Sequence, residues 1–139
     1  MKILKQIRDL CISYYKDRLL CLVVFGSVAK DSFSPLSDID LLIIFKDKKD
    51  QYKEYADYYN NVENKLLFKK DLPVEINPIF KSFKDLKVKT PYFWNTEFLI
   101  LYDRENLFKE FLNKLEKFKS KSIIIHKEPV EYIELVNEQ

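Results

Sequence analysis

Two short, almost uninterrupted apolar runs stand out along the chain and predict buried strands. One is residues 19–25 (LLCLVVF) and the other is residues 38–45 (DIDLLIIF). Strands that are covered on both faces show such continuous runs rather than an alternation with polar residues. Two further segments, 72–80 (LPVEINPIF) and 97–103 (EFLILYD), predict a third strand, cut by Pro78, and a fourth.

Helical periodicity marks the segments around these runs. Apolar residues at helical spacing predict an amphipathic helix over 3–17, and Leu and Phe residues at core spacing predict another over 104–119. Residues 50–68, rich in Tyr, Lys, Glu and Asn, predict a mostly exposed helix. This order of elements predicts one α/β (α+β) domain over residues 1–120. Residues 121–139 form a C-terminal tail of unassigned role, in which Ile123 to Ile125 are a candidate edge strand.

Composition and charge narrow the class of protein. The 24 basic residues nearly match the 22 acidic ones, and a net charge of +2 does not identify a nucleic-acid binder. Three lysine-rich stretches, 46–53, 81–89 and 109–121, are expected to be solvated helix faces rather than a surface for RNA or an acidic partner. No segment approaches the ~20 apolar residues of a membrane span, and the N-terminus is too charged for a signal peptide. We therefore expect a cytoplasmic protein without a membrane partner, in which Cys11 and Cys21 are buried thiols.

The chain contains a single glycine, Gly26, where an average sequence of this length would hold about ten. It follows the first predicted strand and precedes Ser27. Gly26 is either a plain turn residue with a positive φ or a position where the backbone lies against a ligand. In the second case the backbone approaches a phosphate closely, and Ser27 offers its hydroxyl and N–H to a phosphate oxygen.

Three carboxylates are expected near this glycine. Asp38 and Asp40 are two residues apart in a strand and share one face of it, and Glu75 is a lone carboxylate in the third strand. Three oxygen ligands on neighbouring strands, completed by water and phosphate, are typical of a Mg²⁺ site for phosphoryl displacement. In the structural alternative, the aspartates are a turn acid and a salt-bridge partner, and Glu75 pairs with a lysine such as Lys69 or Lys70.

The pattern Gly26-Ser27, ten intervening residues and Asp38-Ile39-Asp40, with a carboxylate in a later strand, resembles the DNA polymerase β-type nucleotidyltransferase superfamily. Within it, the chain is most similar to the minimal nucleotidyltransferases (MNT), the antitoxin partners of HEPN-domain toxins. The resemblance implies a small mixed β-sheet backed by helices, the palm-like fold of polymerase β.

The resemblance also implies roles for the site residues. Gly26 and Ser27 would bind the phosphates of the nucleotide, and Asp38 and Asp40 would bind both metal ions. Glu75 would be the third carboxylate, which helps to activate the attacking hydroxyl. The implied activity is Mg²⁺-dependent transfer of AMP from ATP to a partner protein, a HEPN-type toxin. The alternatives are nucleotidyl transfer to a small molecule or a nucleic acid, and a non-catalytic module that neutralises its partner by contact.

The resemblance covers residues 19–80 closely and the fourth strand with the following helix more loosely. Many relatives have Ala-Arg-Gly after the Gly-Ser pair, whereas this chain has Ala29-Lys30-Asp31. Lys30 keeps the positive charge without the two-pronged geometry of arginine. Glu75 stands where aspartate is commoner and is longer by one methylene group.

An aromatic cluster follows the third predicted strand. Tyr92, Phe93, Trp94 and Phe98 are expected to pack in the core, and stacking on an adenine is the alternative. The single histidine, His126, is expected on the surface of the tail.

Overall fold

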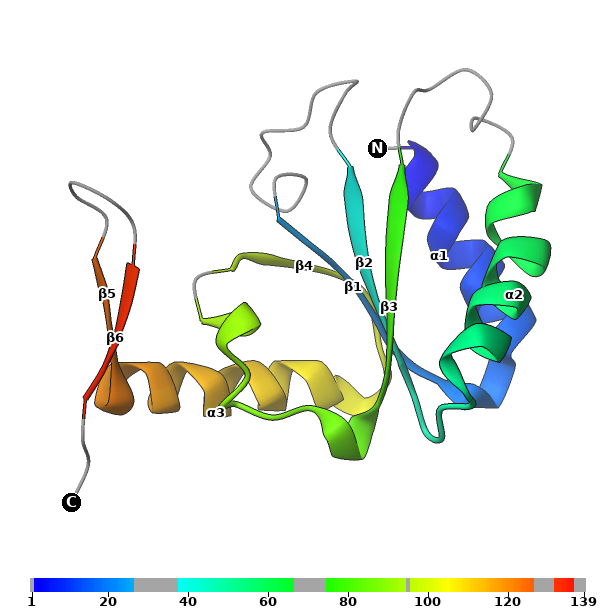
Figure 1. Ribbon diagram of the computed structural model, residues 1–139. Helices are drawn as coiled ribbons and strands as arrows, with labels where there is room; N and C mark the ends of the chain where they lie inside the picture. Colours follow the sequence, from blue (N-terminus) through cyan, green and yellow to red (C-terminus); the bar gives the residue numbers. More distant parts are fainter. Residues whose placement is uncertain (1, 27–37, 67–74, 95, 127–131, 137–139) are drawn as a thin grey trace.

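A four-stranded mixed sheet in the order β3-β2-β1-β4 forms the centre of the protein (Figure 1). The computed structural model describes residues 2–26, 38–66, 75–94, 96–126 and 132–136. Strand β2 is parallel to β3 and antiparallel to β1, and β1 is antiparallel to β4. The helices and strands are α1 (Lys2–Tyr15), β1 (Leu19–Phe25), β2 (Ile39–Phe45), α2 (Gln51–Asn61), β3 (Ile76–Ser82), β4 (Phe98–Asp103), α3 (Leu107–Ser122), β5 (Ile123–His126) and β6 (Tyr132–Leu135).

Helices α1 and α2 cover one face of this sheet (Figure 1). Alternate residues of a strand point to opposite faces, so Ile39, Leu41 and Ile43 of β2 point together toward these helices. They share one buried apolar cluster with Ile3 and Ile7 of α1.

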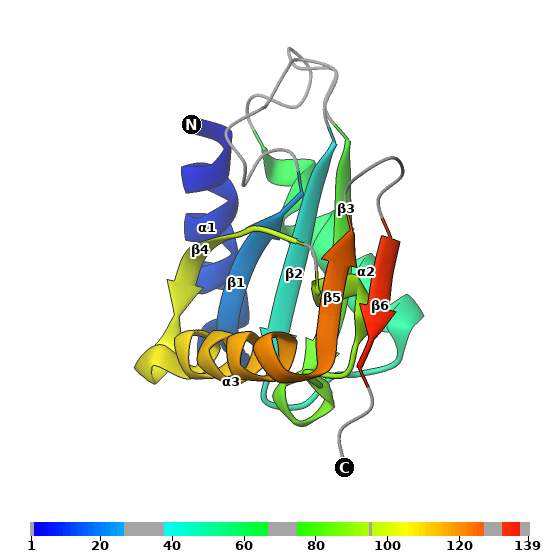
Figure 2. The same cartoon turned by 90° about the vertical axis from the view of Figure 1, so that its left-hand side faces the viewer.

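The opposite face of the sheet is covered by α3 and by the segment 83–94. In Figure 2, α3 runs across the strands rather than along them. Leu42 and Ile44 lie in a second buried cluster with Phe108 and Phe111 of α3. Because both faces are covered, β1 is buried along its whole length, and in β2 every residue except Asp40 is buried. These two strands therefore have the continuous apolar sequence of fully covered strands.

Strand β3 is one element that the sequence misplaces. It runs from Ile76 to Ser82 and includes Pro78, so the expectation that Pro78 cuts the strand is wrong. The strand tolerates Pro78 because β3 is at the edge of the sheet. The Ile39 N–H donates to the Glu75 carbonyl at 2.8 Å. In a parallel pair, the backbone groups of alternate residues face the neighbouring strand, so Glu75, Asn77 and Ile79 direct theirs toward β2. The nitrogen of Pro78 therefore faces away from β2.

Helix boundaries differ from the expectations by a few residues. Helix α2 ends at Asn61 and a short 3-10 turn follows, so the expected single helix over 50–68 is too long. Helix α3 begins at Leu107 rather than at residue 104. A turn with positive φ at Glu105 and Asn106 comes before it. The Asp103 carboxylate, at the end of β4, accepts hydrogen bonds from the first backbone N–H groups of α3 and so caps this helix.

The described part of the tail forms a separate hairpin. Residues 123–125 do form a strand, β5, but it pairs with β6 and not with the four-stranded sheet, so the edge-strand expectation is wrong. The hairpin lies at the far end of α3, away from the sheet (Figure 1). His126 is paired with Tyr132 in this ladder.

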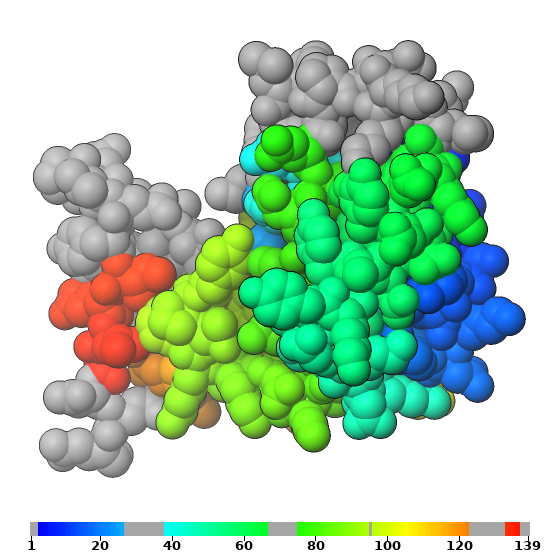
Figure 3. All heavy atoms as spheres, turned by 45° about the vertical axis from the view of Figure 1, so that its right-hand side comes forward, coloured from blue at the N-terminus to red at the C-terminus, as the bar shows by residue number. Residues whose placement is uncertain are grey.

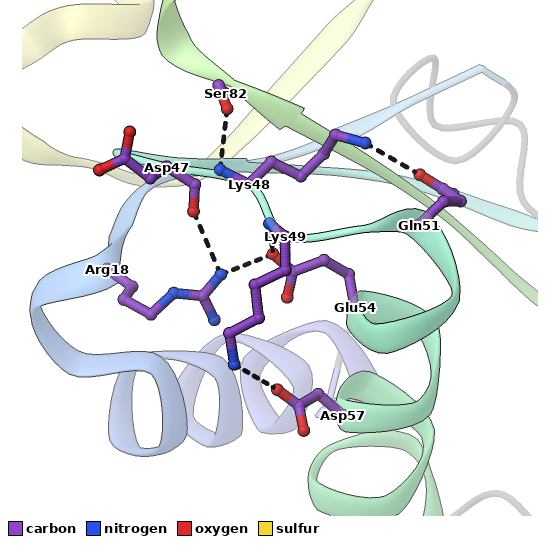
Figure 4. A network of polar contacts seen from close by, with 8 residues as sticks. All are labelled: Arg18, Asp47, Lys48, Lys49, Gln51, Glu54, Asp57 and Ser82. Carbon is purple, nitrogen blue, oxygen red and sulfur yellow. Dashed lines mark hydrogen bonds and ion pairs between the residues drawn. The ribbon is translucent and has the colours of Figure 1, made fainter.

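Helix α2 is held against the sheet by a buried ion pair (Figure 4). Glu54 is fully buried and accepts hydrogen bonds from the Arg18 guanidinium and from the Lys49 N–H at 2.9 Å. Arg18 also donates to the Asp47 carbonyl and lies 4.4 Å above the ring of Phe45. The pair therefore joins α2 to the turn before β1 and the turn after β2, which lie together at one end of these antiparallel strands.

Cys11 and Cys21 are both buried free thiols, as the sequence predicts. Within the described ranges, every helix is too short or too polar to cross a membrane.

Candidate active site

The described residues that the sequence singles out lie at one end of the central strands. Strand β1 ends here and β2 and β3 begin here, because β1 is antiparallel to β2 and β2 is parallel to β3. Phe25 pairs with Asp40, and Ile39 pairs with Ile76. The chain reversal after β1 and the parallel pairing of β3 thus bring the glycine and the carboxyl-bearing residues together.

Gly26 lies directly against Asp40. Its φ is +84°, a backbone conformation that side chains other than glycine rarely adopt. A Cβ atom built on Gly26 would lie 3.0 Å from the Asp40 Oδ2 atom. The positive φ agrees with the first explanation of the glycine, a turn residue, and the close Asp40 carboxylate is a further reason for it. The second explanation, a backbone that lies against a phosphate, stays a prediction.

Asn77 holds the other oxygen of the same carboxylate. It pairs with Asp40 in the parallel ladder, and its Nδ2 donates to Asp40 Oδ1 at 3.3 Å. Asp40 thus has one oxygen above Gly26 and one on an amide donor. Asn77 is not among the residues predicted from the sequence, although its position two residues after Glu75 is a usable signal, since such residues share a face of the strand.

Asp38 and Glu75 flank this central contact. Both are exposed, and each immediately precedes a strand rather than lying within it. Among the residues that the structure describes, no three acidic, histidine or cysteine side chains are grouped closely enough to hold a metal ion. Two aspartates with phosphate oxygens nevertheless make a donor set that suits Mg²⁺, which proteins often bind through one or two carboxylates and the phosphates of a substrate.

Several residues of the expected site lie outside the described ranges. They are Ser27, Lys30 and Asp31 of the glycine loop and the two alternative partners of Glu75, Lys69 and Lys70. The role of Ser27 and the lysine pairing of Glu75 therefore stay predictions.

The aromatic cluster divides between the core and the site. Phe93 and Trp94 are buried, and the Trp94 Nε1 donates to the Val88 carbonyl at 2.8 Å, so packing in the core is confirmed for them. Tyr92 is the exception, since it is 55% exposed and its ring meets Phe25 edge-on at 5.3 Å. Partial burial and, secondarily, the negative charge of Asp40 raise the pKa of the Tyr92 phenol. Tyr92 therefore lies beside the candidate site.

Comparison with known families identifies the domain. The family model of the polymerase beta nucleotidyltransferases matches residues 5–89, which include the whole of β1, β2 and β3. The chain belongs to this family. The nucleotidyltransferase activity class and the α+β fold expected from the Gly-Ser and Asp-x-Asp pattern are thereby confirmed.

Individual relatives extend this result along the chain. A protein named "Putative protein adenylyltransferase MJ1305", from Methanocaldococcus jannaschii, is 26% identical over 118 residues, which are 82% of this chain and 79% of its own length. A crystal structure from Shewanella oneidensis matches with a TM-score of 0.50 and 14% identity over 86% of this chain and 87% of its own. This second similarity supports the fold alone.

A third similarity is weaker. A crystal structure of a tri-AMPylated HEPN toxin from Shewanella oneidensis in complex with its MNT antitoxin matches with a TM-score of 0.47 and 13% identity. The match covers 85% of this chain and 87% of that one. At this score the similarity does not bear on the partner of the present nucleotidyltransferase.

Proposed function

We propose that this nucleotidyltransferase is a Mg²⁺-dependent protein adenylyltransferase that transfers AMP from ATP to a hydroxyl group of a partner protein. Its membership of the family supports nucleotidyl transfer, and the name of the Methanocaldococcus jannaschii relative supports AMP and a protein acceptor. The observation that carries the proposal is the contact between Gly26 and Asp40. It places a carboxylate beside backbone in a conformation that side chains rarely adopt, which supports a site for phosphate and a metal ion.

The residues of this chain then have distinct tasks. Asp38 and Asp40 would hold Mg²⁺, which offsets the charge of the triphosphate and stabilises the charge that develops during transfer. Asn77 keeps Asp40 in one orientation through its amide donor. Gly26 and Ser27 would bind phosphate oxygens with backbone and hydroxyl groups.

The reaction itself needs one proton acceptor. The acceptor oxygen bonds to the α-phosphorus of ATP while the bond from that phosphorus to the oxygen bridging to the β-phosphate breaks. Pyrophosphate leaves with the bonding electrons, and Glu75 takes the proton of the attacking hydroxyl. Glu75 suits this task because its exposed side chain lies beside the start of β2, in reach of an incoming protein.

A HEPN-type toxin is the proposed acceptor. The support is the resemblance of the Gly26-Ser27 and Asp38-Ile39-Asp40 pattern to the antitoxins of the minimal nucleotidyltransferase group.

Labelled ATP tests this proposal. Purified protein, Mg²⁺ and the HEPN-type candidate partner should yield partner labelled from α-labelled ATP and not from γ-labelled ATP. Asp40→Asn should lower the labelling by about 100-fold or more, because loss of even an outer partner of a metal ligand often costs about 10–100-fold. The matched control is Asp57→Asn, which changes an aspartate of α2 outside the site and should leave labelling unchanged.

The same experiment separates the alternatives. Tight binding of the partner without labelling by any of the four nucleoside triphosphates would favour a module that acts by contact alone. Labelling from γ-labelled ATP would indicate phosphorylation and would contradict the proposal.

A further inference from the structure

A cavity of about 260 Å³ opens on the sheet beside the candidate active site. Its floor consists of Phe25 of β1, Leu42 of β2 and Ile79 of β3, and Tyr92 forms part of its wall. In Figure 3, the yellow-green segment that contains Tyr92 stands beside β3 with a recess between them. The lining is mainly apolar and aromatic, as in pockets that take a flat ring.

This cavity is continuous with the site because of the strand geometry. Leu42 follows Asp40 by two residues and Ile79 follows Asn77 by two residues, so each pair shares one face at a spacing of about 7 Å. Phe25, the third floor residue, is paired with Asp40 and precedes Gly26. The other end of a ligand whose phosphates lie at Gly26 and Asp40 can therefore reach the cavity.

Two polar side chains line the cavity as well. Lys81 is the next residue of β3 on the same face, four residues and about 13 Å beyond Asn77, and Thr90 belongs to the segment before Tyr92. Lys81 is half-buried and has no hydrogen-bond or ion-pair partner among the described residues. An ammonium group at an apolar cavity gains from a ligand that presents a hydrogen-bond acceptor.

We propose that this cavity binds the base of the nucleotide, with Lys81 and Thr90 as the residues that read its edge. This inference rests on the proposed function, which supplies ATP as the ligand. The adenine ring would lie between the floor and Tyr92, which provides an aromatic surface. Lys81 would donate to a ring nitrogen, and the Thr90 hydroxyl would accept from the exocyclic amine.

The position of Lys81 favours a base over the acceptor side chain. An acceptor must place its hydroxyl at the α-phosphorus, next to Asp40, and has no use for a cation at the far end of the cavity. A nucleotide has its phosphates at one end and hydrogen-bonding atoms on its base at the other. The candidate active site offers carboxylates and glycine, and the adjoining cavity offers the polar groups of Lys81 and Thr90, which matches the two ends of a nucleotide.

Binding measurements with ATP and with inorganic tripolyphosphate, both in Mg²⁺, test the inference, because only ATP has a base. Titration calorimetry on the whole chain should show that wild type binds ATP at least tenfold more tightly than tripolyphosphate. Lys81→Met should lower ATP affinity about tenfold or more, the value of a lost hydrogen bond to a charged group, and leave tripolyphosphate affinity unchanged. Lys84→Met, at an exposed lysine outside the cavity, is the matched control and should change neither.

A second variant fills the cavity. Ile79→Trp should also reduce ATP affinity to that of tripolyphosphate, and unchanged melting temperatures would show that both variants are folded. Equal affinity of wild type for the two ligands would overturn the base site while leaving nucleotidyl transfer intact. Loss of tripolyphosphate binding in Lys81→Met would likewise overturn it. A wild type that binds neither ligand would contradict both the base site and the proposed function.

Discussion

Gly26 and Asp40 constrain each other at the level of single atoms. Gly26 has a φ of +84°, and the space that its Cβ would need is occupied by the Asp40 Oδ2 atom at 3.0 Å. The other oxygen of this carboxylate is held by Asn77. Because the proposed phosphate-binding backbone and the proposed metal-binding carboxylate both depend on this contact, substitution at residue 26 should affect folding and function together.

We expect Gly26→Ala to lower the free energy of unfolding by about 1–2 kcal/mol, since an L-residue in this conformation is strained and its Cβ displaces Asp40. Urea denaturation measures this change. Asp40→Ala removes the carboxylate, so in that background Gly26→Ala should cost only the strain of the backbone. Equal costs in both backgrounds would show that the carboxylate contact is not what limits residue 26.

Among the secondary-structure elements, helix α2 depends on one buried carboxylate for its position against the sheet. Glu54 is fully buried and its charge is met by Arg18, whose guanidinium also lies over Phe45 (Figure 4). The nearby pair between Lys49 and Asp57 is partly exposed. Removing one partner of a buried ion pair costs more stability than removing one partner of an exposed pair. The reason is that water solvates the remaining charge of an exposed pair but not that of a buried pair.

We expect Arg18→Ala to lower the free energy of unfolding by about 3–5 kcal/mol, because it leaves the fully buried Glu54 of α2 without its counter-charge. Asp57→Ala, on the same helix, should cost about 1 kcal/mol or less. Chemical denaturation of the two variants makes the comparison. Similar costs for both would mean that the Glu54–Arg18 pair does not hold α2 in place.

The sequence predicts elements better than it predicts their pairing. Strand β1 has the expected bounds and β2 begins one residue later, because continuous apolar runs are a strong local signal. The parallel register of β3 is a long-range property that no local pattern reveals. For that reason Asn77 was not recognised beside Asp40, although Gly26 and Asp40, which the sequence singles out, do lie against each other.

Two buried cysteine thiols and two buried tyrosine phenols make the stability of the whole molecule depend on pH. Burial raises the pKa of the Cys11 thiol from 9.0 to about 12. Burial, and secondarily the charge of Asp103, raise the pKa of Cys21 from 9.0 to about 12. Burial also raises the pKa of the Tyr15 and Tyr58 phenols. These groups stay neutral in the folded protein at pH values where the unfolded chain has already lost their protons.

Stability should therefore fall in alkali. The contribution of these groups is fully present below about pH 8.5, where the unfolded chain also keeps its protons, and is lost as the pH rises from about 9 to 12. Each ionising thiol contributes a slope of up to about 1.4 kcal/mol per pH unit. Urea denaturation between pH 7 and 11 measures it, and Cys11→Ala should show a shallower slope than wild type. An unchanged slope in that variant would mean that Cys11 is not buried as a neutral thiol.

Pro78 has a consequence for how copies of this chain behave at high concentration. Edge strands expose a row of backbone donors and acceptors that can template stacking of one molecule on another into fibres. The outer edge of β3 lacks one donor in its middle, because the Pro78 nitrogen faces away from β2 and has no hydrogen. A strand with this gap is a poor template for a strand of another molecule. Pro78, which the fold tolerates at the edge, therefore also opposes edge-to-edge aggregation of the protein at high concentration.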